Sequence, residues 1–256
     1  MLSGQTQHTD GFLTHSDQIP LFPSETVREW GPTLVVAPHP DDETLGCGGA
    51  IALLSALNLP VNVLFISDGK GSHPNSRQYP PSALRDLREQ EAREALEMLG
   101  AAPSAPIFLR LPDGSVPGEH AVDFAEAVAL CRSILEDFKP QTVLMPWRRD
   151  PHPDHRATSQ IMRAALGGIS DGPRILEYPI WAWERAAPED VPHADEVRAF
   201  RLDIGKVTDV KRSAVAAHRS QVTHMIDDDP DGFWLSPEVL AHFDRSWEVY
   251  LEVLSW

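Results

Sequence analysis

The sequence predicts an α/β fold built on a single doubly wound, mostly parallel sheet with helices on both faces. Between residues 33 and 178, five short apolar runs alternate with longer segments of helical period, as in successive strand–helix–strand units. Right-handed crossovers then make the Rossmann-like strand order 3-2-1-4-5 the default expectation. We expect residues 1–30 to form an N-terminal extension and residues 31–256 a single domain with a C-terminal elaboration.

The predicted strands are short β-branched or apolar runs bounded by proline, glycine or polar turns. They are expected at 33–37, 61–66, 106–111, 142–145 and 174–178, with an added strand at 197–204. Helices are expected where apolar residues recur at three- to four-residue spacing, at 47–57, 82–99, 121–138, 154–166 and 206–218.

Three glycines, Gly46, Gly48 and Gly49, precede or begin the first predicted helix. Their spacing differs from the G-x-G-x-x-G of a dinucleotide-binding loop, and the carboxylates at 41–43 would repel a pyrophosphate. We therefore expect these glycines to let the helix approach the sheet closely.

Size and charge exclude several classes of protein. Hydrophobic residues make up 42% and charged residues 23% of the 256 residues, which is typical of a globular protein. The 38 acidic and 22 basic side chains give a net charge of −16, which disfavours nucleic acid and anionic membranes as partners. The acidic run at 227–231 is expected in a solvated loop.

The cysteine content and the apolar patterning indicate a cytoplasmic protein. Two cysteines cannot form a disulfide framework, and no segment has the pattern of a signal peptide or the length of a membrane span. No membrane insertion is expected. The sequence is compatible with a homo-oligomer but does not specify one.

Two segments rich in histidine and aspartate follow predicted strands. The segment 38–43 (PHPDDE) follows the strand at 33–37, and the segment 149–155 (RDPHPDH) follows the strand at 142–145. In the expected order these two strands are neighbours at the point where the winding reverses, which is where doubly wound proteins bind ligands. The topology therefore predicts that the two segments meet in one site.

Side chains of these segments predict a catalytic metal centre. Two imidazoles and a carboxylate, from His39, Asp42 and His155, suit a borderline-soft divalent cation and leave a position for water. We expect Asp41 to be the general base toward that water. His152, as an imidazolium, is expected to stabilise an oxyanion or to protonate a leaving amine.

The residues also leave other interpretations open. The segments could be polar loops whose aspartates cap helices, and Asp41 could accept backbone N–H groups within its turn. Asp154, a third candidate catalytic residue, either orients the His152 ring or caps the helix that follows. A non-haem Fe(II) oxygenase uses the same ligand types, and a catalytically silent sugar-binding protein would keep the same pocket.

The motifs resemble those of the LmbE-like (PIG-L) deacetylases. The segment 37–43 (APHPDDE), followed by LGCGG at 45–49, is similar to the family's opening signature, although Pro38 stands where the family usually joins alanine directly to histidine. HPDH at 152–155 resembles its second signature. Further similarities lie at 67–69, 88–100, 111–114 and 211–221. The resemblance implies a zinc-dependent hydrolase that removes an acyl group, commonly acetyl, from an amino sugar or its conjugate.

The resemblance also implies roles for individual residues. It makes His39, Asp42 and His155 the metal ligands, Asp41 the base, and His152 the acid or oxyanion stabiliser. These roles agree with those suggested by the residue types alone.

Two further residues are substrate-binding candidates by resemblance. The family's substrate-binding arginine falls on Arg88, with Arg85 as a nearby competitor, and Asp113 is expected to contact sugar hydroxyls. Alternatively, Arg88 is a solvated helix charge paired with Glu91, and Asp113 belongs to an ordinary Asp–Gly turn.

Specificity is expected to reside in the loops at 70–81 and 181–196, which carry no recognisable motif. Trp181 and Trp183 in the second loop either stack on a sugar or serve only in packing. His218 and Gln221, which fall in the similar C-terminal segment, are left without an assigned role at the pocket rim.

Overall fold

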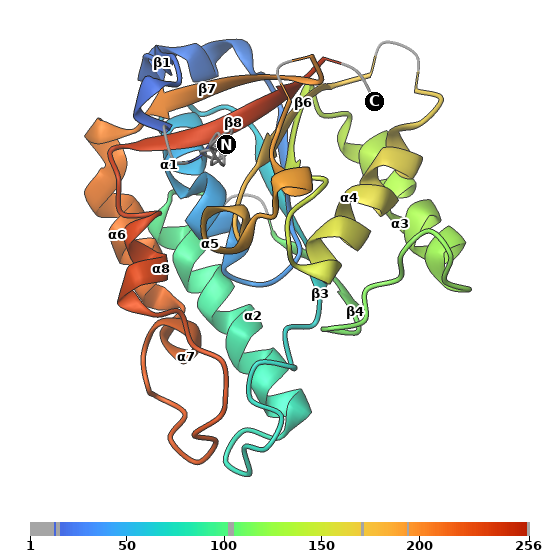
Figure 1. Cartoon of the computed structure of the whole chain (residues 1–256), viewed down its shortest axis with the longest axis vertical. Helices are drawn as coiled ribbons and strands as arrows, with labels where there is room; N and C mark the ends of the chain where they lie inside the picture. Colours follow the sequence, from blue (N-terminus) through green and yellow to red (C-terminus); the bar gives the residue numbers. More distant parts are fainter. Residues whose placement is uncertain (1–12, 14–15, 102–104, 170–171, 194, 255–256) are drawn as a thin grey trace, which may run out of the picture.

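The structure, a computed structural model, describes residues 13, 16–101, 105–169, 172–193 and 195–254. A mixed sheet forms its centre (Figure 1). The strands are β1 (Leu21–Phe22), β2 (Thr33–Ala37), β3 (Val61–Ser67), β4 (Ile107–Leu111), β5 (Thr142–Pro146), β6 (Arg174–Tyr178), β7 (Val197–Asp203) and β8 (Trp247–Val253). They form one eight-stranded sheet in the order β1-β7-β8-β6-β5-β2-β3-β4.

A single α/β sheet with helices is confirmed, but the sheet is larger and less uniformly parallel than predicted. The strands β4, β3, β2, β5 and β6 are neighbours in that order and run parallel. The added strand at 197–204 is confirmed as β7, whereas β8 was not predicted and runs antiparallel to both β6 and β7. The Glu248 and Glu252 carboxylates interrupt the apolar pattern of β8, and Glu248 is nevertheless buried. The strand was not predicted because an acidic residue is not expected at a buried strand position.

The five longest of the described helices occur close to where the sequence predicted helices, whereas three short helices of four or five residues were not predicted. The described helices are α1 (Asp42–Ala56), α2 (Pro81–Met98), α3 (Phe124–Phe138), α4 (Pro153–Leu166), α5 (Ala182–Arg185), α6 (Thr208–Ala217), α7 (Arg219–Val222) and α8 (Pro237–Ala241), with short 3₁₀ turns η1 (Ser16–Gln18), η2 (Ser24–Glu29), η3 (Pro188–Asp190) and η4 (Gly205–Val207). Helix α1 begins already at Asp42, so the carboxylates of Asp42 and Glu43 lie in its first turn and Asp41 is its N-cap residue.

Two of the three apolar cores formed by the described residues lie on opposite faces of the sheet. Helices α1, α2 and α6 pack together on one face, and α3 packs on α4 on the other (Figure 1). The cysteines are divided between these cores, since Cys47 lies in the first and Cys131 in the second, both buried and unbonded. Trp30, which precedes β2, is fully buried in the first core, with its ring edge-on to Tyr250 at 5.4 Å.

The glycines of α1 allow close packing, as expected. A Cβ atom on Gly46 would lie 2.4 Å from the Tyr178 ring, and one on Gly49 would lie 2.5 Å from Ile204. Both distances are shorter than van der Waals contact. Helix α1 can therefore pack this closely against Tyr178 and Ile204 only because Gly46 and Gly49 have no side chain. Among the described residues, no helix combines the length and apolarity needed to cross a bilayer.

The acidic run at 227–231 is not simply a solvated loop, which corrects the prediction. Asp228 accepts the backbone N–H groups of Arg77 at 2.7 Å and Gln78 at 2.9 Å. Asp229 accepts the N–H of Asn75 at 2.8 Å and is only 4% exposed. These carboxylates therefore link the loop between α7 and α8 to the loop between β3 and α2. The two loops lie side by side at the bottom of Figure 1.

Candidate metal centre

The adjacent, parallel strands β2 and β5 deliver the two motifs to one place. His39 lies in the turn between β2 and α1, and His155 lies in the first turn of α4, directly after the loop that follows β5. Their ring centroids are 5.3 Å apart, and the ring of His152 lies 4.8 Å from His39 and 5.0 Å from His155. The structure thus brings together the two motifs that the expected topology made neighbours.

The Asp42 carboxylate lies between two imidazoles. Its Oδ2 atom is 3.2 Å from Nδ1 of His39 and 3.2 Å from Nε2 of His155. Burial would raise the pKa of Asp42, but the charges of His155 and His39 and the hydrogen bond with His39 hold it well below its usual range. Asp42 Oδ2 also accepts the backbone N–H of His39 at 2.9 Å, which fixes the carboxylate in the turn.

The fully buried His155 ring provides a test of whether a metal ion fits here. Neither of its nitrogens makes a hydrogen bond with any described residue, although Asp42 and Asp150 lie 3.2 Å and 3.3 Å away. A buried polar atom is normally hydrogen-bonded, so this nitrogen pair needs an explanation. Asp42 Oδ2 lies beside one nitrogen of His39 and one nitrogen of His155, and a donor set of two nitrogens and one oxygen fits a divalent ion.

The opposite edge of the His39 ring faces two other carboxylates. Nε2 of His39 is 3.2 Å from Oδ1 of Asp113 and 3.2 Å from Oδ2 of Asp154. These three groups could also surround an ion. However, both oxygens of Asp154 accept backbone N–H groups, from Gly114 at 2.7 Å and from Val116 at 3.2 Å. This edge therefore fits better as an anchor for the Nε2–H group of His39.

The position of Asp154 corrects both interpretations offered for it. Its carboxylate contacts His39 and does not orient His152. Nor is Asp154 the N-cap of α4, because His152 occupies that position and its Nδ1 accepts the backbone N–H of Asp154 at 3.2 Å. The neutral His152 ring therefore carries its proton on Nε2.

His152 differs from expectation in its charge. Burial and the neighbouring charges of His155 and His39 lower the pKa of His152 to about 4, so the ring is neutral at neutral pH and not the imidazolium that the sequence suggested. Nitrogens of His39, His152 and His155 are close enough to share an ion. That second ligand set conflicts with the Nε2–H tautomer, because a protonated nitrogen cannot bind a metal.

Asp41 is held in an unusual backbone conformation, with φ of 151°. Such strain in a non-glycine residue costs on the order of 1–3 kcal/mol and must be held by its surroundings. Its N–H donates to Glu43 Oε2 at 2.9 Å, and its carboxylate contacts Nη2 of Arg88 at 3.1 Å. Burial raises the pKa of Asp41 to about 6, although the Arg88 charge opposes the shift. The side chain makes no capping bond, unlike the alternative considered.

Arg88 is buried, with 3% of its surface exposed, so its interpretation as a solvated helix charge is wrong. Besides Asp41, its guanidinium donates to the carbonyl groups of Gly69 and Pro40, both at 2.9 Å. Glu91 bonds instead to Ser220, at 2.9 Å to its N–H and 2.6 Å to its hydroxyl.

The structure also shows the surroundings of Arg85, His218 and Gln221. Arg85 pairs with its neighbour Asp86 on the exposed side of α2. His218 is buried, with its Nε2 3.0 Å from Glu43 Oε1. Gln221 donates to the Ser72 hydroxyl at 3.2 Å.

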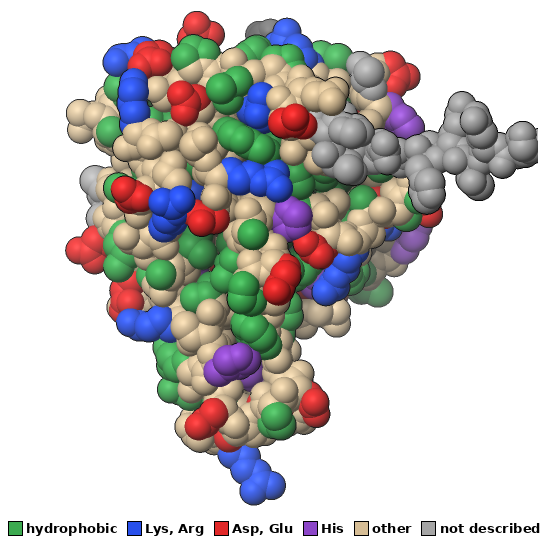
Figure 2. Space-filling view, turned by 60° about the vertical axis from the view of Figure 1, so that its left-hand side comes forward, with side chains coloured by type: hydrophobic (Ala, Val, Ile, Leu, Met, Phe, Trp, Pro, Cys, Tyr) green, Lys and Arg blue, Asp and Glu red, His purple; other side chains and the backbone are tan. Residues whose placement is uncertain are grey.

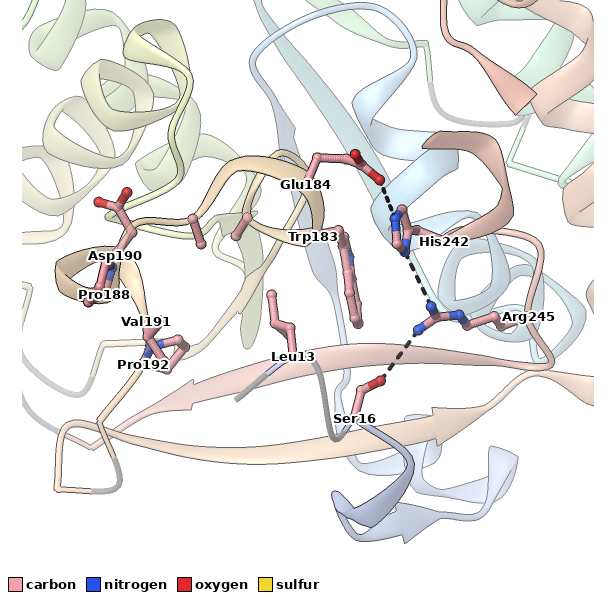
Figure 3. A pocket seen from close by; sticks show the side chains of 12 residues that line it. Leu13, Ser16, Trp183, Glu184, Pro188, Asp190, Val191, Pro192, His242 and Arg245 are labelled. Atoms are coloured by element: carbon pink, nitrogen blue, oxygen red, sulfur yellow. Dashed lines mark hydrogen bonds and ion pairs between the residues drawn. The ribbon is translucent and has the colours of Figure 1, made fainter. Parts of the chain in front are cut away.

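A cleft of about 360 Å³ opens beside these groups. Its lining comprises His39, Asp41, Asp42, Leu45, Gly71, Ser72, Arg88, Asp113, Gly114, His152, Ile180, Trp181, Arg185, Phe233 and Leu235. The volume is within the range typical of small-molecule sites. Trp181 therefore belongs to the cleft. Trp183 lines a separate pocket of about 440 Å³, where it lies beside His242 and Arg245 (Figure 3).

Sequence reasoning missed two buried carboxylates that support the centre. Asp150 lies against Nδ1 of His155, and its Oδ2 accepts the backbone N–H groups of Ile180 at 3.1 Å and Trp181 at 2.9 Å. Glu43 joins His218 to the backbone of Asp41. Both acids stand inside the motifs, yet only the folded chain reveals their partners.

The comparisons with known proteins agree with this architecture. Residues 34–166 match the family described as "PIG-L: GlcNAc-PI de-N-acetylase", and this chain belongs to that family. It is 30% identical to the 1D-myo-inositol 2-acetamido-2-deoxy-alpha-D-glucopyranoside deacetylase of Nocardia farcinica, over 75% of this chain and 81% of the relative.

Two further proteins are similar to this chain. The probable N-acetyl-alpha-D-glucosaminyl L-malate deacetylase 2 of Bacillus subtilis is 30% identical over 75% of this chain and 84% of its own. The solved N,N'-diacetylchitobiose deacetylase from Pyrococcus horikoshii covers 90% of this chain and 86% of its own, with a TM-score of 0.67 and 21% identity. At that identity the structural likeness establishes the fold.

Proposed function

We propose that this protein is a metal-dependent deacetylase that hydrolyses the N-acetyl group of an amino sugar or an amino-sugar conjugate. The observation that carries the proposal is the convergence of His39, Asp42 and His155 beside the buried, ionisable Asp41. The activities named for its sequence relatives support the same reaction.

We assign the metal ligands as Nδ1 of His39, Oδ2 of Asp42 and Nε2 of His155. Zinc is the ion that we propose, because two imidazoles, one carboxylate and an open position form a typical catalytic zinc site. When bound, such an ion makes water more acidic and polarises a carbonyl group. Asp150 and Asp154 would then hold the far nitrogens of the two histidines.

Asp41 is the proposed general base. With its pKa near 6, the carboxylate is mostly ionised at neutral pH and can still accept a proton readily. Arg88 holds the carboxylate at 3.1 Å and fixes its direction. Asp41 takes a proton from the attacking water as the water oxygen bonds to the acetyl carbonyl carbon.

His152 is the proposed oxyanion stabiliser. Its Nε2–H donates to the oxygen that becomes negative when the carbonyl carbon becomes tetrahedral. The C–N bond then breaks, and the proton held on Asp41 passes to the departing nitrogen, which leaves a free amine and acetate. Arg88 and Asp113, which line the cleft, are the proposed contacts for the sugar.

The proposal is tested by supplying N-acetylglucosamine conjugates to the zinc-loaded protein under anaerobic conditions. We expect equal amounts of free amine and acetate, and loss of both after chelation. Product formation that requires oxygen would favour the Fe(II) oxygenase, and tight binding with no amine released would favour a silent sugar-binding protein.

A further inference from the structure

Arg185, the last residue of α5, has a positive charge without a partner in the described part of the chain. Its guanidinium carbon lies 4.6 Å from the centre of the Trp181 ring. No carboxylate or carbonyl oxygen of a described residue bonds to it, and it lines the outer part of the cleft. Arg88, the other arginine of the cleft, already donates to Asp41 and to two carbonyl groups, although its buried Nε has no hydrogen-bond partner among the described residues.

Arg28 and Arg77, which are also exposed, have no ion pair among the described residues either, but neither of them lines the cleft. With a net charge of −16, acidic side chains are abundant, and several other exposed or half-exposed arginines pair with them. Examples are Arg156 with Asp190 at 2.9 Å and Arg212 with Asp209 at 2.9 Å. The N–H groups of Arg185 thus stay available to a ligand.

The arrangement of the cleft shows which part of a ligand Arg185 would meet. The buried lining residues include His39 and Asp41, with Asp113 nearly buried, and the proposed chemistry puts the N-acetyl group at this inner end. Arg185 and Phe233 are exposed and mark the outer end, where the Trp181 and Phe233 rings meet edge to face at 5.8 Å. An amino sugar with its acetyl group at the inner end would therefore direct its attached group toward Arg185.

We infer that the natural substrate carries an anionic group, a carboxylate or a phosphate, on the part joined to the amino sugar, and that Arg185 binds it. This inference rests on the proposed deacetylase function. A guanidinium presents a planar fork of N–H donors that matches both anions, and stacking on an aromatic ring holds that fork in place.

Binding to the zinc-loaded Asp41→Asn variant tests the inference without turnover. Calorimetry would compare the neutral methyl glycoside of N-acetylglucosamine with two charged probes: its glycoside with a hydroxycarboxylic acid, and N-acetylglucosamine 1-phosphate. We expect at least one charged probe to bind roughly tenfold to hundredfold more tightly than the neutral one. The two charged probes distinguish a carboxylate from a phosphate.

Adding Arg185→Met should bring the ratio of charged to neutral affinity close to one, and Arg185→Lys should restore part of it. Arg93→Met is the matched control, because Arg93 also lies 4.6 Å from an aromatic ring, that of Phe108, but outside the cleft. This control should keep the full ratio.

Three results would overturn the inference. All probes could bind equally to the protein that keeps Arg185, the ratio of charged to neutral affinity could stay the same after Arg185→Met, or no probe could bind. Turnover of the neutral glycoside by the unmodified zinc protein is measured separately. Turnover with equal probe affinities would leave the deacetylase proposal intact and reject only the role of Arg185.

Discussion

Nε2 of His39 lies 3.2 Å from Oδ2 of Asp154, a residue 115 positions further along the chain. Together with the contact of Asp42 on Nδ1, this leaves the His39 ring little freedom to rotate. The carboxylate would fix the tautomer that exposes the Nδ1 lone pair to an ion. The two motifs are thus joined by direct contacts between their own side chains.

The first prediction concerns this contact. Asp154→Asn should weaken zinc affinity by about 10–100-fold, because the amide holds the His39 N–H less strongly and one backbone N–H loses its acceptor. Competition with a chromophoric chelator measures the affinity, and circular dichroism reports the fold. Asp86→Asn, at an exposed acid outside the cleft, is the control and should bind zinc normally. Unchanged affinity in Asp154→Asn would reject the anchoring role.

The second prediction separates the two possible ligand sets. Asp42→Asn should abolish stoichiometric zinc binding, since it removes the carboxylate that lies between both ligand histidines. His152→Gln should retain zinc and lose turnover by roughly 10²–10³-fold, the usual effect of removing one oxyanion donor. Metal analysis after gel filtration measures the zinc content of both variants, and steady-state kinetics measures the turnover of His152→Gln. Zinc loss in His152→Gln instead would make His152 a ligand.

The third prediction concerns the base. Asp41→Asn should bind zinc as the unmodified protein does but release amine on the order of 10²–10⁴-fold more slowly. The carboxamide keeps the size of the side chain and cannot accept the proton. Zinc content and amine release are measured on the same preparation. Full activity would remove Asp41 from the mechanism.

The fourth prediction concerns pH. Asp41 can act as the proposed base only when it is ionised, so the rate should fall as the pH falls through the pKa of Asp41. Because the Arg88 charge lowers that pKa, Arg88→Met should raise it and move the acidic limb of the kcat profile to higher pH. Arg88→Lys should shift the limb less. A profile that falls in the same pH range in all three proteins would show that Arg88 does not act on the base.

The fifth prediction concerns the packing of α1. Gly46→Ala should lower the free energy of unfolding by about 1–3 kcal/mol, because the added methyl group collides with the Tyr178 ring. Gly48→Ala is the control in the same helix, where the nearest atom is Cγ of the Lys211 side chain at 3.1 Å. Urea denaturation should show a clearly smaller loss for the control. Similar losses for both variants would contradict the argument.

Much of the scaffold follows from local patterns. Strands β2, β3, β5 and β6 are short apolar runs between turn residues, and their helices show a clear period, so both were predictable. Strand β8 was not, because its apolar pattern is interrupted by Glu248, whose carboxylate is satisfied by Lys211 and by the backbone of Gly49. Such long-range compensation leaves no mark on the local sequence.

The candidate site, like the scaffold, has features that the sequence predicts and features that only the folded chain reveals. The sequence by itself determined which chemistry is available, because the residue types at His39, Asp42 and His155 and the strands that precede them set the proposed ligand atoms and their common edge. Only the tertiary structure decided that Asp154 holds His39, that His152 is neutral, and that Arg185 stacks on Trp181 without an ion pair to any described residue. The reason is physical: a side chain's role depends on its neighbours and its burial, and here these come from segments far apart in the chain.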